Sequence, residues 1–150
     1  MRAMTLVSVL RPRPVRVLLA ALALTIASLF GVPWGLYAWG LSQFGEQRPA
    51  LPGQLLSTEQ QTALWQQMGA DGSPAMVMLD PVSYVMSAAS QSPPPPSTAV
   101  AWRVASSFTR QTLGAEHSVR LHIASTAMAI WLTRHHTLAQ LLSQMAATAA

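Results

Sequence analysis

The sequence contains no cysteine. A disulfide framework, a zinc site built on thiolates and a thiol nucleophile are therefore excluded, and the redox compartment is left open. Charged residues are also scarce, at 9% of the 150 residues, whereas 51% are apolar. The chain is less charged than an average globular protein, as membrane proteins are, and this composition excludes disorder throughout the chain. The length permits at most one ordinary domain.

The C-terminal part of the chain has no excess of charge of either sign. From residue 45 onward, five arginines balance five acids, so the net charge of +4 comes from the N-terminus alone. Its four arginines are Arg2, Arg11, Arg13 and Arg16. Because no basic face can form over the rest of the chain, we do not expect a nucleic-acid partner.

A long apolar run follows these arginines. No charged residue lies between Arg16 and Glu46, and residues 17–41 exceed the roughly 20 residues that a membrane-spanning helix needs. By the positive-inside rule the N-terminus stays in the cytoplasm. The sequence therefore predicts a single-pass protein of the inner (cytoplasmic) membrane: a cytoplasmic segment 1–16, an anchor 17–44 and a periplasmic C-terminal part.

Two alternatives to the anchor remain open. A cleaved signal peptide has a shorter apolar core, which is followed by a cleavage site with the pattern small-x-small. Residues 28–37 offer no convincing site of that kind. The other alternative is a buried helix of a soluble protein. Trp34, Tyr37 and Trp39 favour the anchor, because aromatic side chains gather where a helix leaves the bilayer.

The remaining chain predicts a linker at 45–56 and a small helical domain at 57–150, with a proline-rich loop at 70–97. The fold class is therefore mainly α, with about four helices beyond the anchor. Three of them begin at recognisable caps: Ser57 with Gln60, Ser118, and Thr137 with Gln140.

Within the proline-rich loop we expect short extended pieces at 76–79 and 83–86. Asp80–Pro81 is interpreted as a turn, and the run of four prolines at 93–96 as a polyproline spacer.

Candidate chemistry is sparse. The four histidines, at 117, 122, 135 and 136, lack the three- or four-residue spacing of helix-borne metal ligands, so neither a metal site nor another cofactor is predicted. Glu116 is the one weak catalytic candidate. A carboxylate before a helix N-terminus is ordinarily a capping or dipole residue, and no serine-nucleophile or phosphate-loop motif occurs.

The C-terminal third has the layout of a known family. A Ser97–Thr98 pair opens the first of three segments, Arg120 and His122 lie in the second, and the third runs from Ala127 to Leu142. In order and spacing these segments resemble the peptidoglycan glycosyltransferase (transglycosylase) family, membrane-anchored enzymes that polymerise lipid II outside the cytoplasmic membrane. Their patterns are S-T-I-T-Q-Q, R-K-x-x-E and K-x-x-I-L.

The chain departs from the family at the residues that carry the chemistry. Leu138 stands at the lysine of the last motif, Leu121 and His122 stand near the Arg-Lys pair, and Ser125 replaces the glutamate. The family's first motif, E-D-x-x-F-x-x-H with the catalytic glutamate, is not recognisable between residues 56 and 96. The resemblance therefore implies a degenerate or truncated domain that binds rather than catalyses.

Two functions follow as hypotheses. The first is an auxiliary role in cell-wall synthesis, through binding of a lipid-linked saccharide or of a synthase; an active glycosyltransferase acting on lipid II is its enzymatic variant. The second is a structural or interaction subunit of an envelope or secretion complex. For the first hypothesis, five side chains are the candidate binding residues: Arg103, Arg120, His122, Trp131 and Arg134.

Overall fold

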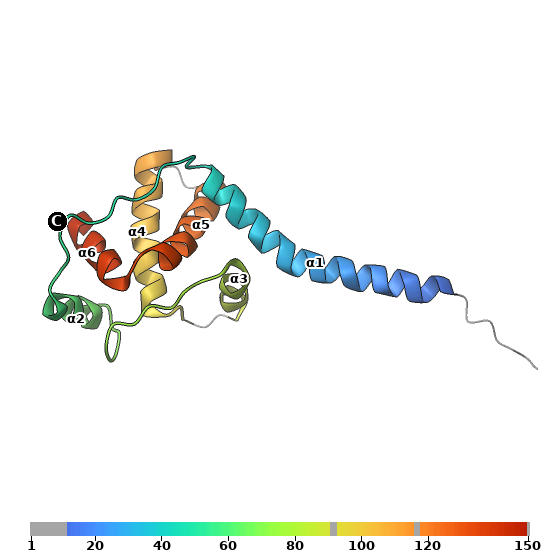
Figure 1. Cartoon of the computed structure of the whole chain (residues 1–150), viewed down its shortest axis with the longest axis horizontal. Helices are drawn as coiled ribbons and strands as arrows, with labels where there is room; N and C mark the ends of the chain where they lie inside the picture. Colours follow the sequence, from blue (N-terminus) through green and yellow to red (C-terminus); the bar gives the residue numbers. More distant parts are fainter. Residues whose placement is uncertain (1–11, 91–92, 116–117, 150) are drawn as a thin grey trace, which may run out of the picture.

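The computed structural model describes residues 12–90, 93–115 and 118–149. Over these residues the chain is all-helical and has no strand. The helices are α1 (Pro12–Ser42), α2 (Thr58–Gln67), α3 (Pro81–Ala89), α4 (Pro96–Leu113), α5 (Val119–His135) and α6 (Leu138–Ala149). Figure 1 shows α1 projecting from a cluster formed by the other five. The mainly α class predicted from the sequence is thus confirmed for these residues.

The N-terminal half of α1 has no neighbours within the protein. Every residue from Val15 to Val32 is exposed, and Pro33 is the first buried one. The helix is long and apolar enough to cross a membrane, two properties that a signal sequence near the N-terminus shares. A buried helix of a soluble core is a different case, because no part of the most apolar window of α1 is covered by protein.

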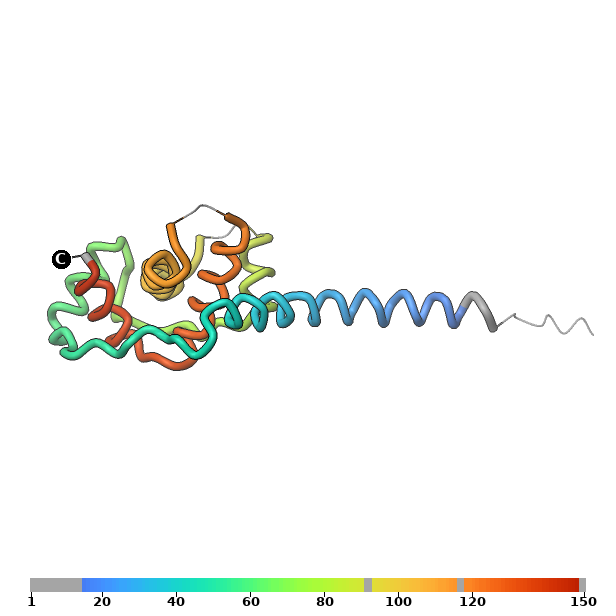
Figure 2. The backbone as a smooth tube through the Cα atoms, turned by 90° about the horizontal axis from the view of Figure 1, so that it is seen from above, coloured from blue at the N-terminus to red at the C-terminus, as the bar shows by residue number. Residues whose placement is uncertain are grey.

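The C-terminal part of α1 packs against α5, with the two helices antiparallel. Gln43 lies beside Arg120 near the start of α5, and Trp34 lies beside Arg134 near its end. Gly40 allows the two backbones to approach closely, since a Cβ there would meet the Cβ of Ala127 at 2.6 Å. The apolar helix therefore continues into the domain without a break (Figure 2).

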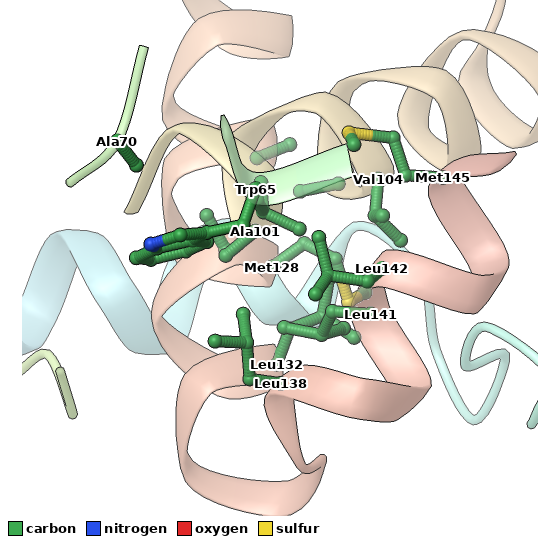
Figure 3. Close-up of a cluster of buried hydrophobic side chains, with 14 of the residues drawn as sticks. Trp65, Ala70, Ala101, Val104, Met128, Leu132, Leu138, Leu141, Leu142 and Met145 are labelled. Carbon is green, nitrogen blue, oxygen red and sulfur yellow. The ribbon is translucent and has the colours of Figure 1, made fainter. Parts of the chain in front are cut away.

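The core lies between α4, α5 and α6 and is closed by α2 and the end of α1 (Figure 3). Burial of each large side chain contributes about 1.5–3 kcal/mol. The fully buried large apolar residues of the core are Met128, Leu132, Leu141, Leu142 and Val100. Phe44, two residues after α1, is also buried and stacks at 5.5 Å on Phe108 of α4, so the end of the apolar segment is part of this core.

The segment 45–56, predicted as a linker, has no helix or strand and lies against the domain. The backbone N–H of Leu56 donates to the Ser143 Oγ at 2.9 Å, and Gln144 donates to the carbonyl of Ala50 at 3.1 Å. The Arg48 guanidinium lies 5.5 Å from the centre of the Trp131 ring. These contacts tie the segment to α5 and α6.

The predicted helix caps are confirmed. Ser57 with Gln60 forms a capping box at α2, and Thr137 with Gln140 forms the equivalent bonds before α6. Ser118 caps α5. At the other ends, Gly69 follows α2 and Gly114 follows α4 with positive φ, the conformation that glycine adopts without steric cost.

The predictions for the proline-rich loop 70–97 were wrong in three places. Residues 83–86 are not extended but belong to the helix α3, and Pro96, the last residue of the predicted polyproline spacer, begins the helix α4. The Asp80–Pro81 pair is not a simple turn, because it begins this helix. The Asp80 carboxylate accepts from the backbone N–H of Val82 and Ser83 at 2.9 Å, and Pro81 occupies the first turn, where its missing N–H is not needed. Over the described residues the domain therefore has five helices beyond α1, one more than predicted.

Candidate functional site

A groove of about 460 Å³ lies between α3, α4 and the start of α5. Its lining is largely apolar, and the polar groups that reach it come mostly from α4 and α5. The lining residues are Leu79, Tyr84, Ser87, Ala88, Pro94, Pro95, Thr98, Ala99, Trp102, Arg103 and His122. None of these is an acid, so a ligand in the groove meets apolar walls, hydroxyls, an imidazole and one guanidinium.

The α3 wall is held in place by backbone bonds to distant side chains. The N–H of Leu79 donates to the Thr133 Oγ1 on α5 at 3.1 Å, and the N–H of Val77 donates to the buried Ser97 Oγ at 3.2 Å. Hydrogen bonds from Ser83, mainly through its side chain, lower the pKa of the Asp80 carboxyl, so the cap of α3 stays ionised at neutral pH. The wall opposite α4 is thus fixed before any ligand binds.

The α4 wall follows from helical spacing. Thr98 and Trp102 are four residues apart, as are Ala99 and Arg103, so both pairs face the same side of the helix. Thr98 is buried, and its hydroxyl oxygen has no hydrogen-bond partner. A buried hydroxyl without a partner is unfavourable, so a polar ligand group that reached it would be stabilised.

The rings of Trp102 and His122 line both this groove and a second cavity. The indole of Trp102 and the imidazole of His122 lie 5.1 Å apart, centre to centre, at an angle of 56°. The second cavity, of about 440 Å³, lies between α4 and α5 and is more polar because it is lined by Ser106, Thr109 and Arg110 among others. The Trp102–His122 pair therefore borders both an apolar space and a polar one.

The structure brings two of the five candidate binding residues together. Arg103 and His122 both line the groove. Arg120 lies elsewhere, donating from Nε to the Gln43 amide oxygen at 2.8 Å. Trp131 and Arg134 lie near the far end of α5.

Those last two residues make aromatic contacts of their own. The Trp131 ring stacks on His135 at 4.3 Å, and the guanidinium of Arg134 lies 5.7 Å from the centre of the Trp34 ring. Glu116, the weak catalytic candidate, lies outside the described residues, as does His117. In the described part of the chain, no three His, Asp or Glu side chains gather as metal ligands would.

Sequence reasoning did not single out Tyr84 or Thr98 as part of a site. Tyr84 is placed by α3, which the sequence analysis interpreted as loop and extended chain. Thr98 was noted only as part of the family pattern, and no local signal shows that its hydroxyl is buried without a partner.

The chain matches no protein-family model, no curated protein and no solved structure. The groove must therefore be interpreted from its own residues.

Proposed function

We propose that this protein is a membrane-anchored binding protein for an anionic amphiphile of the lipid-linked saccharide type, auxiliary to cell-wall synthesis. The observation that carries the proposal is the groove between α3, α4 and α5, whose apolar walls and single guanidinium match a ligand with a hydrocarbon tail and a phosphate.

The position of α1 supports the anchor. Residues 15–32, which are all exposed, would extend about 27 Å at about 1.5 Å per residue, close to the roughly 30 Å of a hydrocarbon core. Beyond them, Gly40 and Phe44 are packed in the domain, so removal of α1 as a signal peptide would take part of the packed structure with it. In this arrangement the domain is periplasmic, at the outer face of the inner membrane, and the ligand reaches the groove from the bilayer.

The proposal is for binding rather than transfer. Glycosyl transfer needs a group to remove a proton and cations to stabilise the leaving pyrophosphate. The described lining supplies Arg103 and His122 but no carboxylate. The segments that resemble the glycosyltransferase family contribute Thr98, Trp102 and His122 to the groove. Because that family acts on lipid II, we propose lipid II as the ligand class.

The test is an equilibrium titration of the full-length protein in lipid nanodiscs with lipid II, followed by tryptophan fluorescence, since Trp102 lines the groove. We expect saturable binding at micromolar lipid II and none with phosphatidylglycerol at the same concentration. Arg103→Gln should weaken binding at least about tenfold, because a hydrogen bond to a charged group contributes about 1.5–3 kcal/mol. Arg120→Gln is the matched control, since Arg120 lies outside the groove, and it should bind as the wild type does.

Three results would contradict the proposal in different ways. A flat titration would leave the interaction-subunit hypothesis, and co-purification with envelope proteins would then be the next measurement. Equal losses from both arginine variants would indicate non-specific charge attraction. Formation of glycan polymer from lipid II by the purified protein would show that the protein is an enzyme after all.

A further inference from the structure

The short helix α3 has two distinct faces. Val82, Val85, Met86 and Ala89 follow the spacing i, i+3, i+4, i+7 and form one apolar face, here called the α3 stripe. Ser83, Ser87 and Ser90 follow the spacing i, i+4, i+7 on another side. Val82 is partly buried, whereas Val85 at 47% and Met86 at 63% are exposed, so the larger part of this apolar face has no cover among the described residues.

The N-terminal part of α3 packs against α1 along one edge of the stripe. Pro81, Tyr84 and Val85 share a small cavity of about 160 Å³ with Pro33, Leu36 and Tyr37 of α1. Both views place α3 on the side of the domain from which the bare part of α1 departs (Figures 1 and 2). The contact therefore falls directly after Val32, the last residue of the uncovered stretch.

This position fixes the level of α3 relative to a bilayer. If residues 15–32 fill the hydrocarbon core, the next turns of α1 lie in the interface, where the exposed rings of Trp34 and Trp39 would be favourable. Because α3 touches α1 at residues 33–37, it lies at the same depth. The α3 stripe and the aromatic residues of α1 are then parts of one apolar band.

The charges on α3 permit such a position. No charged residue occurs from Pro81 to Ala89, and the one acid beside the helix, Asp80, holds its carboxylate on the backbone N–H groups of the first turn. Met78, just before the helix, is 75% exposed and also apolar. Nothing along this surface opposes contact with acyl chains.

We propose that α3 is a second membrane contact, lying in the interface of the leaflet from which α1 emerges, with the α3 stripe towards the acyl chains. The occupant of the stripe is lipid, because the stripe continues the uncovered apolar surface of α1. The proposal rests on α1 as a transmembrane anchor. With α3 so placed, the mouth of the groove, which Tyr84 and Ser87 line, opens at the bilayer surface.

The absence of cysteine makes the test direct, because one introduced thiol is the only one in the protein. Single variants Leu24→Cys, Met86→Cys and Ser83→Cys are labelled with an environment-sensitive fluorophore and reconstituted as the full chain into phosphatidylcholine–phosphatidylglycerol vesicles. Gln66→Cys on α2, at the far end of the domain, is the aqueous reference. Quenching by nitroxide-labelled lipid and by aqueous iodide is measured at each site.

We expect the labels at positions 24 and 86 to be quenched by the lipid nitroxide at least threefold more than the label at position 66, and to be protected from iodide. The label at position 83 should resemble that at position 66. All four sites are exposed, so the substitutions leave the buried packing intact, and Val85→Cys provides a second reporter on the α3 stripe. Ser83→Cys removes the side-chain hydrogen bond to the backbone of Asp80, so its helix content is compared with that of the wild type by circular dichroism before the label is read.

The outcomes separate the two proposals. Lipid quenching at position 24 with iodide quenching at positions 85 and 86 would overturn the contact by α3 and leave the anchor. Iodide quenching at position 24 would overturn the anchor and the α3 contact with it. Protection of position 86 from both quenchers would show that protein, not lipid, covers the stripe, and would also overturn the proposal.

Discussion

Gly40 of α1 lies so close to Ala127 of α5 that the two helices contact each other through their backbones. A Cβ at position 40 would be 2.6 Å from the Ala127 Cβ and 2.9 Å from the carbonyl oxygen of Ile123. Separations under 3.0 Å are not tolerated by real side chains, and here one of the neighbours is backbone, which cannot move alone. The contact between α1 and the domain thus depends on a missing methyl group.

Gly40→Ala should therefore destabilise the domain although alanine favours helices. We expect a loss of about 1–3 kcal/mol, the usual cost of overpacking, seen as a lower midpoint in thermal unfolding followed by circular dichroism in detergent. Gly35→Ala is the matched control in the same helix, because a Cβ there meets nothing within 4 Å. It should be neutral or stabilising by up to about 1 kcal/mol. Equal midpoints for the two variants would contradict the close contact.

The pKa of His136, just after α5, is lowered by burial and secondarily by the nearby His135. Because the folded state resists protonation more than the unfolded chain does, stability should be complete above the ordinary pKa of about 6.5 and decrease as the pH falls below it. We expect a lower unfolding midpoint in urea at pH 5 than at pH 7.5. His136→Gln should reduce that difference, since the group then has no proton to take up.

His135→Gln serves as the control for this pH effect. His135 is exposed, so its replacement should leave most of the pH dependence in place. If His135→Gln and His136→Gln reduced the difference equally, burial of His136 would not be its cause.

Asp80 should be the residue on which α3 depends. Asp80→Ala removes the acceptor for two backbone N–H groups, and loss of such a cap costs about 1 kcal/mol. Because the pKa of Asp80 is lowered in the folded state, its contribution is present above the ordinary value of 3.8 and lost as the pH falls through the folded pKa. Asp80→Asn, also a good cap, should match the wild type at neutral pH but lack this acid-induced loss.

Hydrogen exchange of the α3 amides, measured by mass spectrometry, resolves the effect of Asp80 from global unfolding. Exchange should speed up in α3 of the alanine variant and stay unchanged in α6, whose cap is independent. Faster exchange in both helices to the same extent would show that Asp80 stabilises the whole domain and not this helix in particular.

Local signals in the sequence were sufficient for most of the fold. Helix caps such as Ser57 with Gln60, and the apolar spacing of Leu138, Leu141 and Leu142, act over a few residues, and the structure has them as predicted. The length of the apolar run likewise predicted α1, although length alone does not distinguish an anchor from a signal sequence.

The helix α3 could not be recognised in the same way. Asp80 and Pro81 favour a turn as readily as a helix start, and the valines and serines that follow are weak helix formers. The position of α3 depends on Thr133, more than fifty residues away, which accepts the N–H of Leu79. Since α3 forms one wall of the groove, the candidate site was predictable only as far as α4 and α5, through Arg103 and His122.

The helix α1 runs unbroken into the α5 contact, so no loop separates the apolar segment from the domain. A domain tethered by a flexible linker samples many orientations and meets its ligand by diffusion. A domain joined to a membrane-spanning segment through a helix keeps one orientation relative to the bilayer normal. Turning α1 about its own axis turns Gly40, α5 and everything built on them by the same angle. The groove is therefore joined to the apolar segment through packed helices, and if that segment spans a bilayer, the direction of the groove is set by the tilt and rotation of α1.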